Sequence, residues 1–120
     1  LILLVNRYLN YLKLNFKVNN AAIFKLNSIK DAKLEDFDTM YNVNLKSVIM
    51  LTQSCLPYLI ETKGIIQYFS RDFLVFILKN ETITKGSIVN VSSIAGTRSF
   101  PGLLPYSLSK AALDQFTKCV

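Results

Sequence analysis

Apolar residues recur at two different spacings along the chain, and each spacing predicts a different kind of element. Residues 87–91 form a short apolar run rich in β-branched side chains, which is typical of a buried parallel strand. Residues 16–18 predict a second strand, and the Asn-Asn-Ala-Ala stretch at 19–22 predicts a polar turn after it. Lys17 fits poorly in such a strand, because a buried lysine must find a partner, reach solvent or lose its charge.

Helical spacing is found in three other segments. In residues 34–41 the apolar positions recur every three or four residues, with acidic residues between them. A longer helix is expected from about Leu45 to Gly64, with a kink at Pro57. Its broad apolar face comprises Val48, Ile49, Cys55, Leu56, Leu59 and Ile60. A third helix opens near Tyr106 and runs to the end of the chain, so the order of elements predicts an α/β fold with a parallel sheet.

The length and composition indicate one globular domain. Of the 120 residues, 51% are hydrophobic, which is enough for a buried core. The two cysteines, Cys55 and Cys119, show none of the paired spacing of a disulfide framework, so we expect a reducing, cytoplasmic location. With no histidine and only two thiols, the sequence does not predict a metal site.

The net charge of +6 does not by itself indicate a nucleic-acid partner, because the basic residues are scattered and form no run. The longest apolar runs, such as residues 73–78, are much shorter than the ~20 residues that a membrane-spanning helix requires. Residues 1–5 are equally short and carry no cleavage pattern. We therefore expect no nucleic-acid binding, no membrane insertion and no secretion.

Tyr106 and Lys110 stand four residues apart on the last predicted helix, so their side chains share one face. Alone, the pair is equally well explained by two solvated surface side chains. Ser93 strengthens the pattern, because it follows the apolar strand, and sites of α/β proteins assemble at strand ends. Asn20 follows the first strand, and Asn44 lies between the two predicted helices. Four separate elements thus contribute polar residues.

In their order, and in the spacing from Ser93 to Tyr106, these motifs resemble the classical short-chain dehydrogenase/reductase family. Its signatures are Asn-Asn-Ala-Gly, a helix asparagine, a strand-end serine and Tyr-x-x-x-Lys. The resemblance covers residues 18–64 and 86–120. It implies a Rossmann-like, doubly wound parallel sheet, here incomplete, that binds NAD or NADP and acts on a small-molecule carbonyl or alcohol.

The resemblance also implies a role for each polar residue near the last helix. Tyr106 would be the general acid/base that exchanges a proton with the substrate oxygen. Lys110 would favour the ionised form of that phenol and hold the hydroxyl groups of the nicotinamide ribose. Ser93 would hydrogen-bond the reacting oxygen without a covalent step. Ser92 is the near rival for this role, and the spacing to Tyr106 favours Ser93.

Asn44 resembles the family asparagine that holds a water molecule linking the active-site lysine to solvent. An ordinary helix-junction asparagine is the alternative. Asn20 and Ala21 match the stretch that lines the adenine-ribose side of the cofactor cleft. Ala22 replaces the usual glycine, which matters only if that position needs a positive φ.

The chain departs from the family pattern in two places. Its four glycines are Gly64, Gly86, Gly96 and Gly102. None precedes Asn20, so the glycine-rich turn that binds the cofactor pyrophosphate is missing from these residues, and the preference for NAD or NADP is unreadable. Both ends are expected to be truncated. Gly64 and Gly86 both resemble the family glycine that leads into the strand before Ser93. Residues 65–86 are therefore interpreted as an insertion in a partial domain that spans residues 1–120. This insertion is either a surface loop or a translated intron.

Three functional hypotheses follow. The first is an oxidoreductase, homo-oligomeric when complete, whose isolated 120 residues are expected to be inactive. The second is a truncated, non-catalytic chain that only associates with full-length subunits through the helices at 45–63 and 106–120. The third, which we consider least favoured, is an anion- or nucleic-acid-binding module that uses the +6 charge. Its salt-dependent binding would survive Tyr106→Phe, whereas a catalytic role would not.

Overall fold

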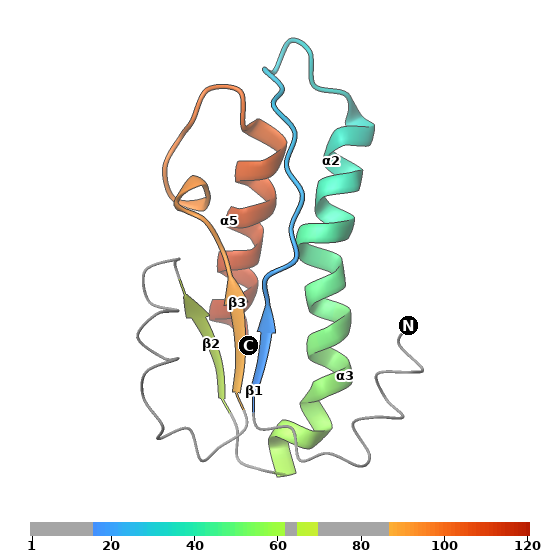
Figure 1. The fold of residues 1–120 in the computed structure, drawn as a ribbon, viewed down its shortest axis with the longest axis vertical. Helices are drawn as coiled ribbons and strands as arrows, with labels where there is room; N and C mark the ends of the chain where they lie inside the picture. Colours follow the sequence, from blue (N-terminus) through green and yellow to red (C-terminus); the bar gives the residue numbers. More distant parts are fainter. Residues whose placement is uncertain (1–15, 62–64, 70–86) are drawn as a thin grey trace.

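The computed structural model describes residues 16–61, 65–69 and 87–120, and they form a parallel sheet with helices packed on it (Figure 1). The strands are β1 (Phe16–Asn19), β2 (Ile65–Phe69) and β3 (Ser87–Val91). Their order in the sheet is β1-β3-β2, and both pairings are parallel. Ile88 and Val89 point to opposite faces of β3, and both are 0% exposed. The prediction of two strands, one of them buried, is therefore confirmed.

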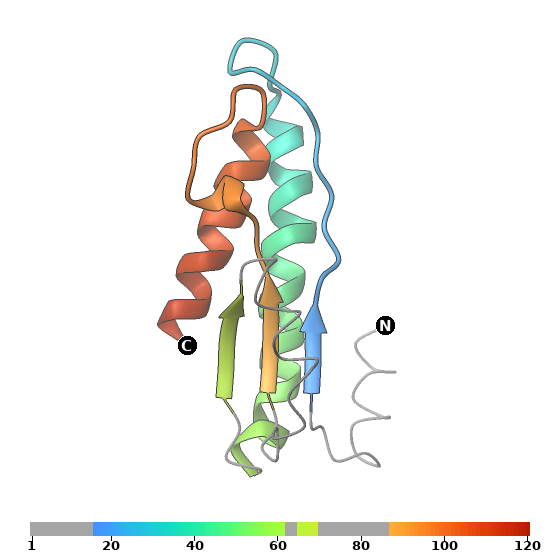
Figure 2. The same ribbon diagram turned by 60° about the vertical axis from the view of Figure 1, so that its left-hand side comes forward.

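Strand β2 is an element that the sequence did not reveal. It lies beside β3 in Figure 2, and Ile65 pairs with Ser87, so both strands start at the same level of the sheet. A short apolar, β-branched start suits a place beside a buried strand, which explains why this segment joins the sheet. The interpretation of residues 65–86 as an insertion stays a prediction, and residues 1–15 and 70–86 lie outside the described residues.

The two helices predicted between the strands are one continuous helix, which corrects the expected break near Leu45. It comprises α2 (Leu34–Tyr41), a π-helical segment η1 (Asn42–Lys46) and α3 (Ser47–Glu61). Both junctions have ordinary right-handed helical backbone angles, and no glycine or proline interrupts them. Pro57 lies within α3.

The apolar face predicted for these helices is only partly confirmed. Met40, Val48 and Cys55 are buried, with exposed fractions of 4% or less. Leu34 and Leu56, which the pattern assigns to the apolar faces of the first and the second helix, are 78% and 42% exposed. The helical spacing correctly identified the helix, but it could not show how wide a stripe the sheet covers.

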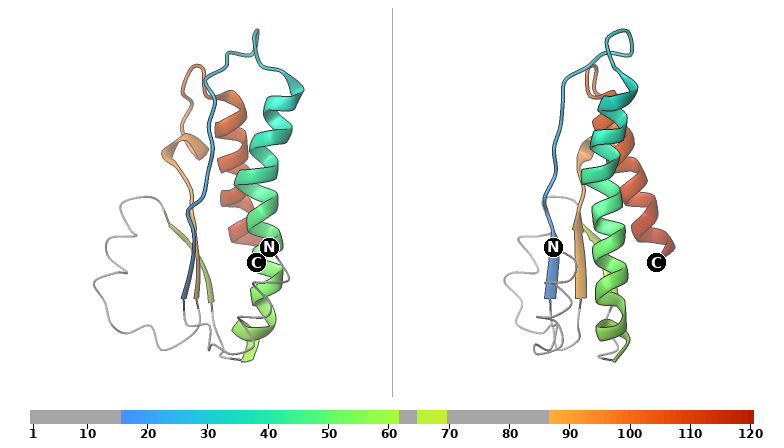
Figure 3. Two further views of the ribbon diagram at one scale, coloured as in Figure 1. Left: turned by 45° about the vertical axis from the view of Figure 1, so that its right-hand side comes forward. Right: turned by 90° about the vertical axis from the view of Figure 1, so that its right-hand side faces the viewer.

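The described helices lie on one face of the sheet, as the edge-on view of Figure 3 shows. The last of them, α5 (Leu104–Cys119), has Pro105 in its first turn, where a missing backbone N–H costs nothing. The helix predicted from near Tyr106 is thus confirmed. Within the ranges that the structure describes, no helix is long and apolar enough to cross a membrane.

Buried polar side chains connect the sheet to this layer of helices. Asn19 Nδ2 on β1 donates to Asn90 Oδ1 on β3 at 2.7 Å, and Asn90 Nδ2 donates to Thr117 Oγ1 on α5 at 3.0 Å. Lys17 finds the partner that its place in β1 requires, because its Nζ donates to the buried Cys55 Sγ at 3.6 Å. These contacts fix the positions of β1, β3 and both helices relative to one another.

Candidate functional site

The carboxyl ends of β1 and β3 point the same way, toward the segments that carry the predicted site (Figure 1). After β3 the chain passes Ser92 and Ser93 and forms a single 3₁₀ turn, η2 (Ile94–Gly96), before it reaches α5. This turn packs on α5. The sheet end and the start of α5 therefore form one continuous region.

Tyr106 and Lys110 share one face of α5, as predicted from their spacing. The Lys110 Nζ lies 5.8 Å from the centroid of the Tyr106 ring. Tyr106 is half-buried, whereas Lys110 is only 3% exposed. The structure thus places an ammonium group beside a phenol that solvent can still reach.

Lys110 is held at the end of β3 by a hydrogen bond from its Nζ to the carbonyl oxygen of Val91, at 2.9 Å. Burial lowers the pKa of Lys110 from its ordinary value of 10.5, because desolvation disfavours the charged form, and the charge of Asp114 opposes this effect. Asp114, one turn further along α5, is itself 5% exposed. Among the described residues, neither of its carboxylate oxygens has a hydrogen-bond partner.

The two serines that follow β3 have different surroundings. Ser92 is buried, and its Oγ donates to the Lys110 carbonyl oxygen at 3.4 Å. Ser93 is half-buried, and its Oγ accepts a hydrogen bond from the Ala95 N–H at 3.2 Å. The Ser93 hydroxyl hydrogen is therefore left to donate, whereas Ser92 is committed to the helix backbone.

Asn44 lies in the π-helical segment η1 and is 1% exposed. Its Oδ1 accepts from the Ile23 N–H at 2.9 Å, and its Nδ2 donates to the Ile23 carbonyl oxygen at 2.9 Å. The same Nδ2 donates to Ser109 Oγ at 3.0 Å, and Ser109 precedes Lys110 on α5. Asn44 therefore links the chain that follows β1 to the helix that carries the tyrosine and lysine.

Asn20 and Ala21 lie in an exposed segment directly after β1. They are placed at the same edge of the sheet as Ser93, but no described contact joins them to Tyr106 or Lys110. The structure thus brings Tyr106 and Lys110 into one region with the end of β3, and Asn44 borders it through Ser109.

Gly96 allows η2 to approach α5 closely. A β-carbon at this position would lie 2.6 Å from Asp114 Oδ2 and 3.1 Å from the Lys110 carbonyl carbon. A larger residue would push η2 away from the lysine, so glycine is needed here for space. Gly102 differs, because nothing lies within 4 Å and its φ of 79° is what favours glycine.

Three residues near the site were not identified from the sequence. Phe24 contacts the Tyr106 ring, Ser109 accepts from Asn44, and Asp114 is the buried carboxylate near Lys110. Asp114 had one available signal, since it stands four residues after Lys110 on the same helix. The others depend on contacts between segments far apart in the chain, which periodicity does not reveal.

A cavity of about 410 Å³ lies next to this region and not at its centre. Phe100, Leu104 and Leu108 contribute to its lining, and Tyr106, Lys110 and Ser93 do not. In the described part of the chain, no group of three or more His, Cys, Asp or Glu side chains is arranged to hold a metal ion. The polar contacts therefore identify the site better than the cavity does.

Comparison with known proteins identifies the family of the chain. The sequence pattern of the short chain dehydrogenase family matches residues 5–120. The chain is 35% identical over 108 residues to 3-oxoacyl-[acyl-carrier-protein] reductase FabG of Thermotoga maritima, covering 90% of this chain and 35% of that protein. It is 36% identical over 101 residues to carbonyl reductase [NADPH] 2 of Sus scrofa, and this match covers 84% of this chain and 33% of that protein.

Among solved structures, the NADPH-bound carbonyl reductase from chicken fatty liver superposes with a TM-score of 0.73 and 28% identity, over 98% of this chain and 42% of that one. This likeness confirms the predicted Rossmann-like fold in incomplete form. The chain spans about a third of the length of the curated relatives it matches. The sequence and the fold lead to one conclusion: the chain belongs to the short chain dehydrogenase family.

Proposed function

We propose that the parent protein transfers a hydride between NAD or NADP and a small-molecule carbonyl or alcohol. By parent protein we mean the longest protein whose sequence contains these 120 residues. The activity would be similar to that of a 3-oxoacyl reductase or an alcohol dehydrogenase. The observation that supports this most directly is the buried Lys110 ammonium, 5.8 Å from the Tyr106 ring centroid and tied to the end of β3.

Tyr106 is the proposed general acid/base, which gives its phenolic proton to the carbonyl oxygen in reduction and takes it back in oxidation. The positive charge of Lys110 would stabilise negative charge that develops on the substrate oxygen and the phenol during proton transfer, and this attraction is stronger in a partly buried site than in water. The hydrogen bond to Val91 fixes the ammonium in this position, so the charge is in place before any substrate arrives.

Ser93 is the proposed donor to the reacting oxygen. Its half-buried hydroxyl retains a hydrogen to donate, and its extended backbone lies two residues after the end of β3. Ser92 suits this role less well, since its hydroxyl is buried against the α5 backbone. Ser93 would hold the carbonyl oxygen next to the Tyr106 phenol and polarise it during hydride transfer.

The residues present fit the nicotinamide end of the cofactor. Lys110 uses one of its three Nζ hydrogens on Val91, which leaves two for the ribose hydroxyl groups. Asn20 and Ala21 are exposed after β1 and would line the neighbouring part of the cleft. The bound nicotinamide would supply the hydride in reduction and accept it in oxidation. Because none of the four glycines precedes Asn20, we propose that the 120 residues alone do not anchor the pyrophosphate and show no turnover.

A second candidate is a non-catalytic chain that pairs with full-length subunits. It is supported by exposed apolar side chains on the two long helices, with Met50 and Leu56 on α3 and Leu108 on α5 each more than 40% exposed. The same surfaces would serve homo-oligomer formation by the parent protein. Both cysteines are free thiols, which suits the reducing cytoplasm that we propose as its location.

The test is to purify the parent protein and the 120-residue chain and to measure the oxidation of NADH and NADPH with a panel of aldehydes and ketones. We expect turnover by the parent protein only. Tyr106→Phe should lower kcat roughly 100- to 10,000-fold, which is the usual contribution of general acid/base catalysis. The matched control is Tyr41→Phe, which removes a half-buried phenol from α2 and should leave kcat unchanged.

Two results would contradict the proposal. One is full activity of Tyr106→Phe. The other is a parent protein that oxidises neither cofactor with any carbonyl compound but still associates with a longer subunit in size-exclusion chromatography, which would favour the non-catalytic pairing function.

A further inference from the structure

An exposed aromatic ring lies against the proposed acid/base. The ring centroids of Phe24 and Tyr106 are 6.1 Å apart, and the ring planes meet at 69°, an edge-to-face contact. Phe24 is nevertheless 68% exposed. Most of its apolar surface therefore faces open space next to the tyrosine and is not used in the core.

The chain on the N-terminal side of Phe24 is fixed by the site itself. Both backbone polar groups of Ile23 bind the amide of Asn44, each at 2.9 Å. Asn44 is 1% exposed and also bonds to α5. The residue that precedes Phe24 therefore keeps a set position relative to the helix that carries Tyr106.

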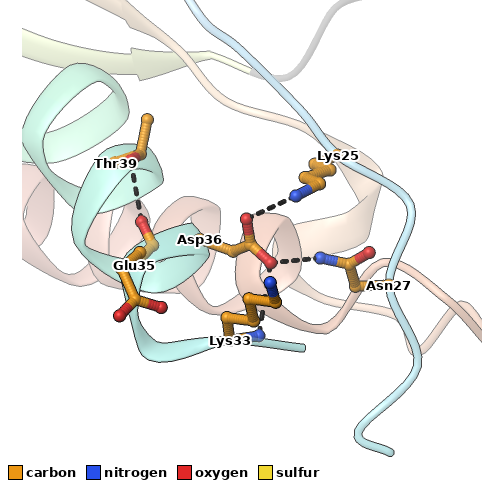
Figure 4. Close-up of polar contacts among 6 residues, drawn as sticks. All are labelled: Lys25, Asn27, Lys33, Glu35, Asp36 and Thr39. Carbon is orange, nitrogen blue, oxygen red and sulfur yellow. Dashed lines mark hydrogen bonds and ion pairs between the residues drawn. The ribbon is translucent and has the colours of Figure 1, made fainter. Parts of the chain in front are cut away.

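The chain on the C-terminal side of Phe24 is fixed by Asp36 of α2, as Figure 4 shows. Lys25 Nζ donates to Asp36 Oδ1 at 2.7 Å, and Asn27 Nδ2 donates to Asp36 Oδ2 at 2.5 Å. The Asn27 N–H also donates to the Gly102 carbonyl oxygen at 2.7 Å. We call residues 23–27 the Phe24 arm. Because it is held on both sides of Phe24, the ring needs little further ordering when a ligand binds.

We propose that Phe24 forms one wall of the substrate site and selects carbonyl compounds that carry a flat aromatic ring next to the carbonyl carbon. This inference rests on the proposed function. A substrate carbonyl hydrogen-bonded to Tyr106 would bring its substituent next to the Phe24 ring. A planar ring can stack on this surface, whereas a saturated ring of similar size gains only apolar contact.

The test compares benzaldehyde with cyclohexanecarbaldehyde, two aldehydes of similar size that differ in the planarity of the ring. The measured quantity is the kcat/KM of the parent protein for benzaldehyde divided by its kcat/KM for cyclohexanecarbaldehyde. Phe24→Leu should lower this ratio by roughly 2- to 10-fold, the range of aromatic-pair contributions beyond apolar burial. Phe24→Tyr keeps the ring and should keep the ratio.

Leu26 provides the matched control, because it lies on the same arm and is also 68% exposed. Leu26→Ala should leave the ratio unchanged. If Phe24→Leu lowers both kcat/KM values equally, Phe24 only supports Tyr106, and if it lowers neither, the ring does not contribute to turnover; either result shows that the inference is wrong. A wild-type parent protein with no activity on either aldehyde or on any other carbonyl compound would overturn the proposed function, and this inference with it.

Discussion

Replacing Asn44 with alanine tests whether one buried amide holds the Phe24 arm in place. The substitution removes three hydrogen bonds, two to the Ile23 backbone and one to Ser109. At about 1 kcal/mol net for each bond, the loss is about 3 kcal/mol. Alanine has a higher helix propensity than asparagine and returns about 0.5 kcal/mol. The expected net loss in free energy of unfolding is therefore about 2–3 kcal/mol.

The control is Asn42→Ala, an exposed asparagine in the same π-helical segment. It has the same propensity gain without the buried contacts and should be neutral or slightly stabilising. Denaturant unfolding, followed by circular dichroism, gives the difference in the free energy of unfolding between the two variants. Amide hydrogen exchange gives the local difference, and the Ile23 amide should exchange roughly 30- to 100-fold faster in Asn44→Ala than in Asn42→Ala. Equal exchange of this amide in both variants would refute the assignment of Asn44 as the residue that holds the arm.

Three further predictions concern the contacts around α5. Gly96→Ala should lower the free energy of unfolding by about 1–3 kcal/mol, because its β-carbon would lie 2.6 Å from Asp114 Oδ2; an unchanged thermal unfolding curve would contradict this close approach. Asn90→Ala should cost about 2–4 kcal/mol in denaturant unfolding, since it removes two buried hydrogen bonds, to Asn19 and Thr117; a loss below 1 kcal/mol would mean that these groups find other partners. Burial lowers the pKa of Lys110, so the unfolded chain binds more protons between that lowered value and 10.5, and the free energy of unfolding should rise with pH in this window. The rise should be smaller in Lys110→Met, and an equal rise in both proteins would show that other groups cause it.

The elements predicted best from the sequence are those whose pattern is local. Strand β3 and helix α5 have strong apolar periods bounded by polar loops, and the structure confirms both. The spacing of Tyr106 and Lys110 on one helix also settles their proximity, because helix geometry alone brings such a pair together.

The features that the sequence did not reveal depend on partners far away in the chain. The side-chain amide of Asn44, in the π-helical segment, binds the backbone of Ile23, twenty-one residues earlier. The helical spacing within residues 34–61 does not predict that contact. Strand β2 is short and depends on pairing with β3. Phe24 carries no motif, so only the structure shows it against Tyr106.

The roles of Asn44, Ser93, Tyr106 and Lys110 stay predictions, although their surroundings suit them to different degrees. The Lys110 Nζ lies 5.8 Å from the centroid of the Tyr106 ring, so the two side chains are at least neighbours, as their predicted roles need. Asn44 was predicted to hold a water molecule, but both of its amide hydrogens already bind protein oxygens, and only its Oδ1 has a lone pair left. Its visible contribution is to position its neighbours.

The π-helical segment sets the rotational phase between α2 and α3. The side chains buried along this helix are Met40, Asn44, Val48, Thr52 and Cys55. A regular α-helix turns about 100° per residue, so each step of four residues overshoots a full turn by about 40°. The wider π turn absorbs part of this drift and keeps the buried side chains in one stripe. Deleting one residue from η1 would leave a regular α turn in its place, so α2 and α3 would keep nearly the same phase, but Asn44 would lose the position from which its amide binds Ile23.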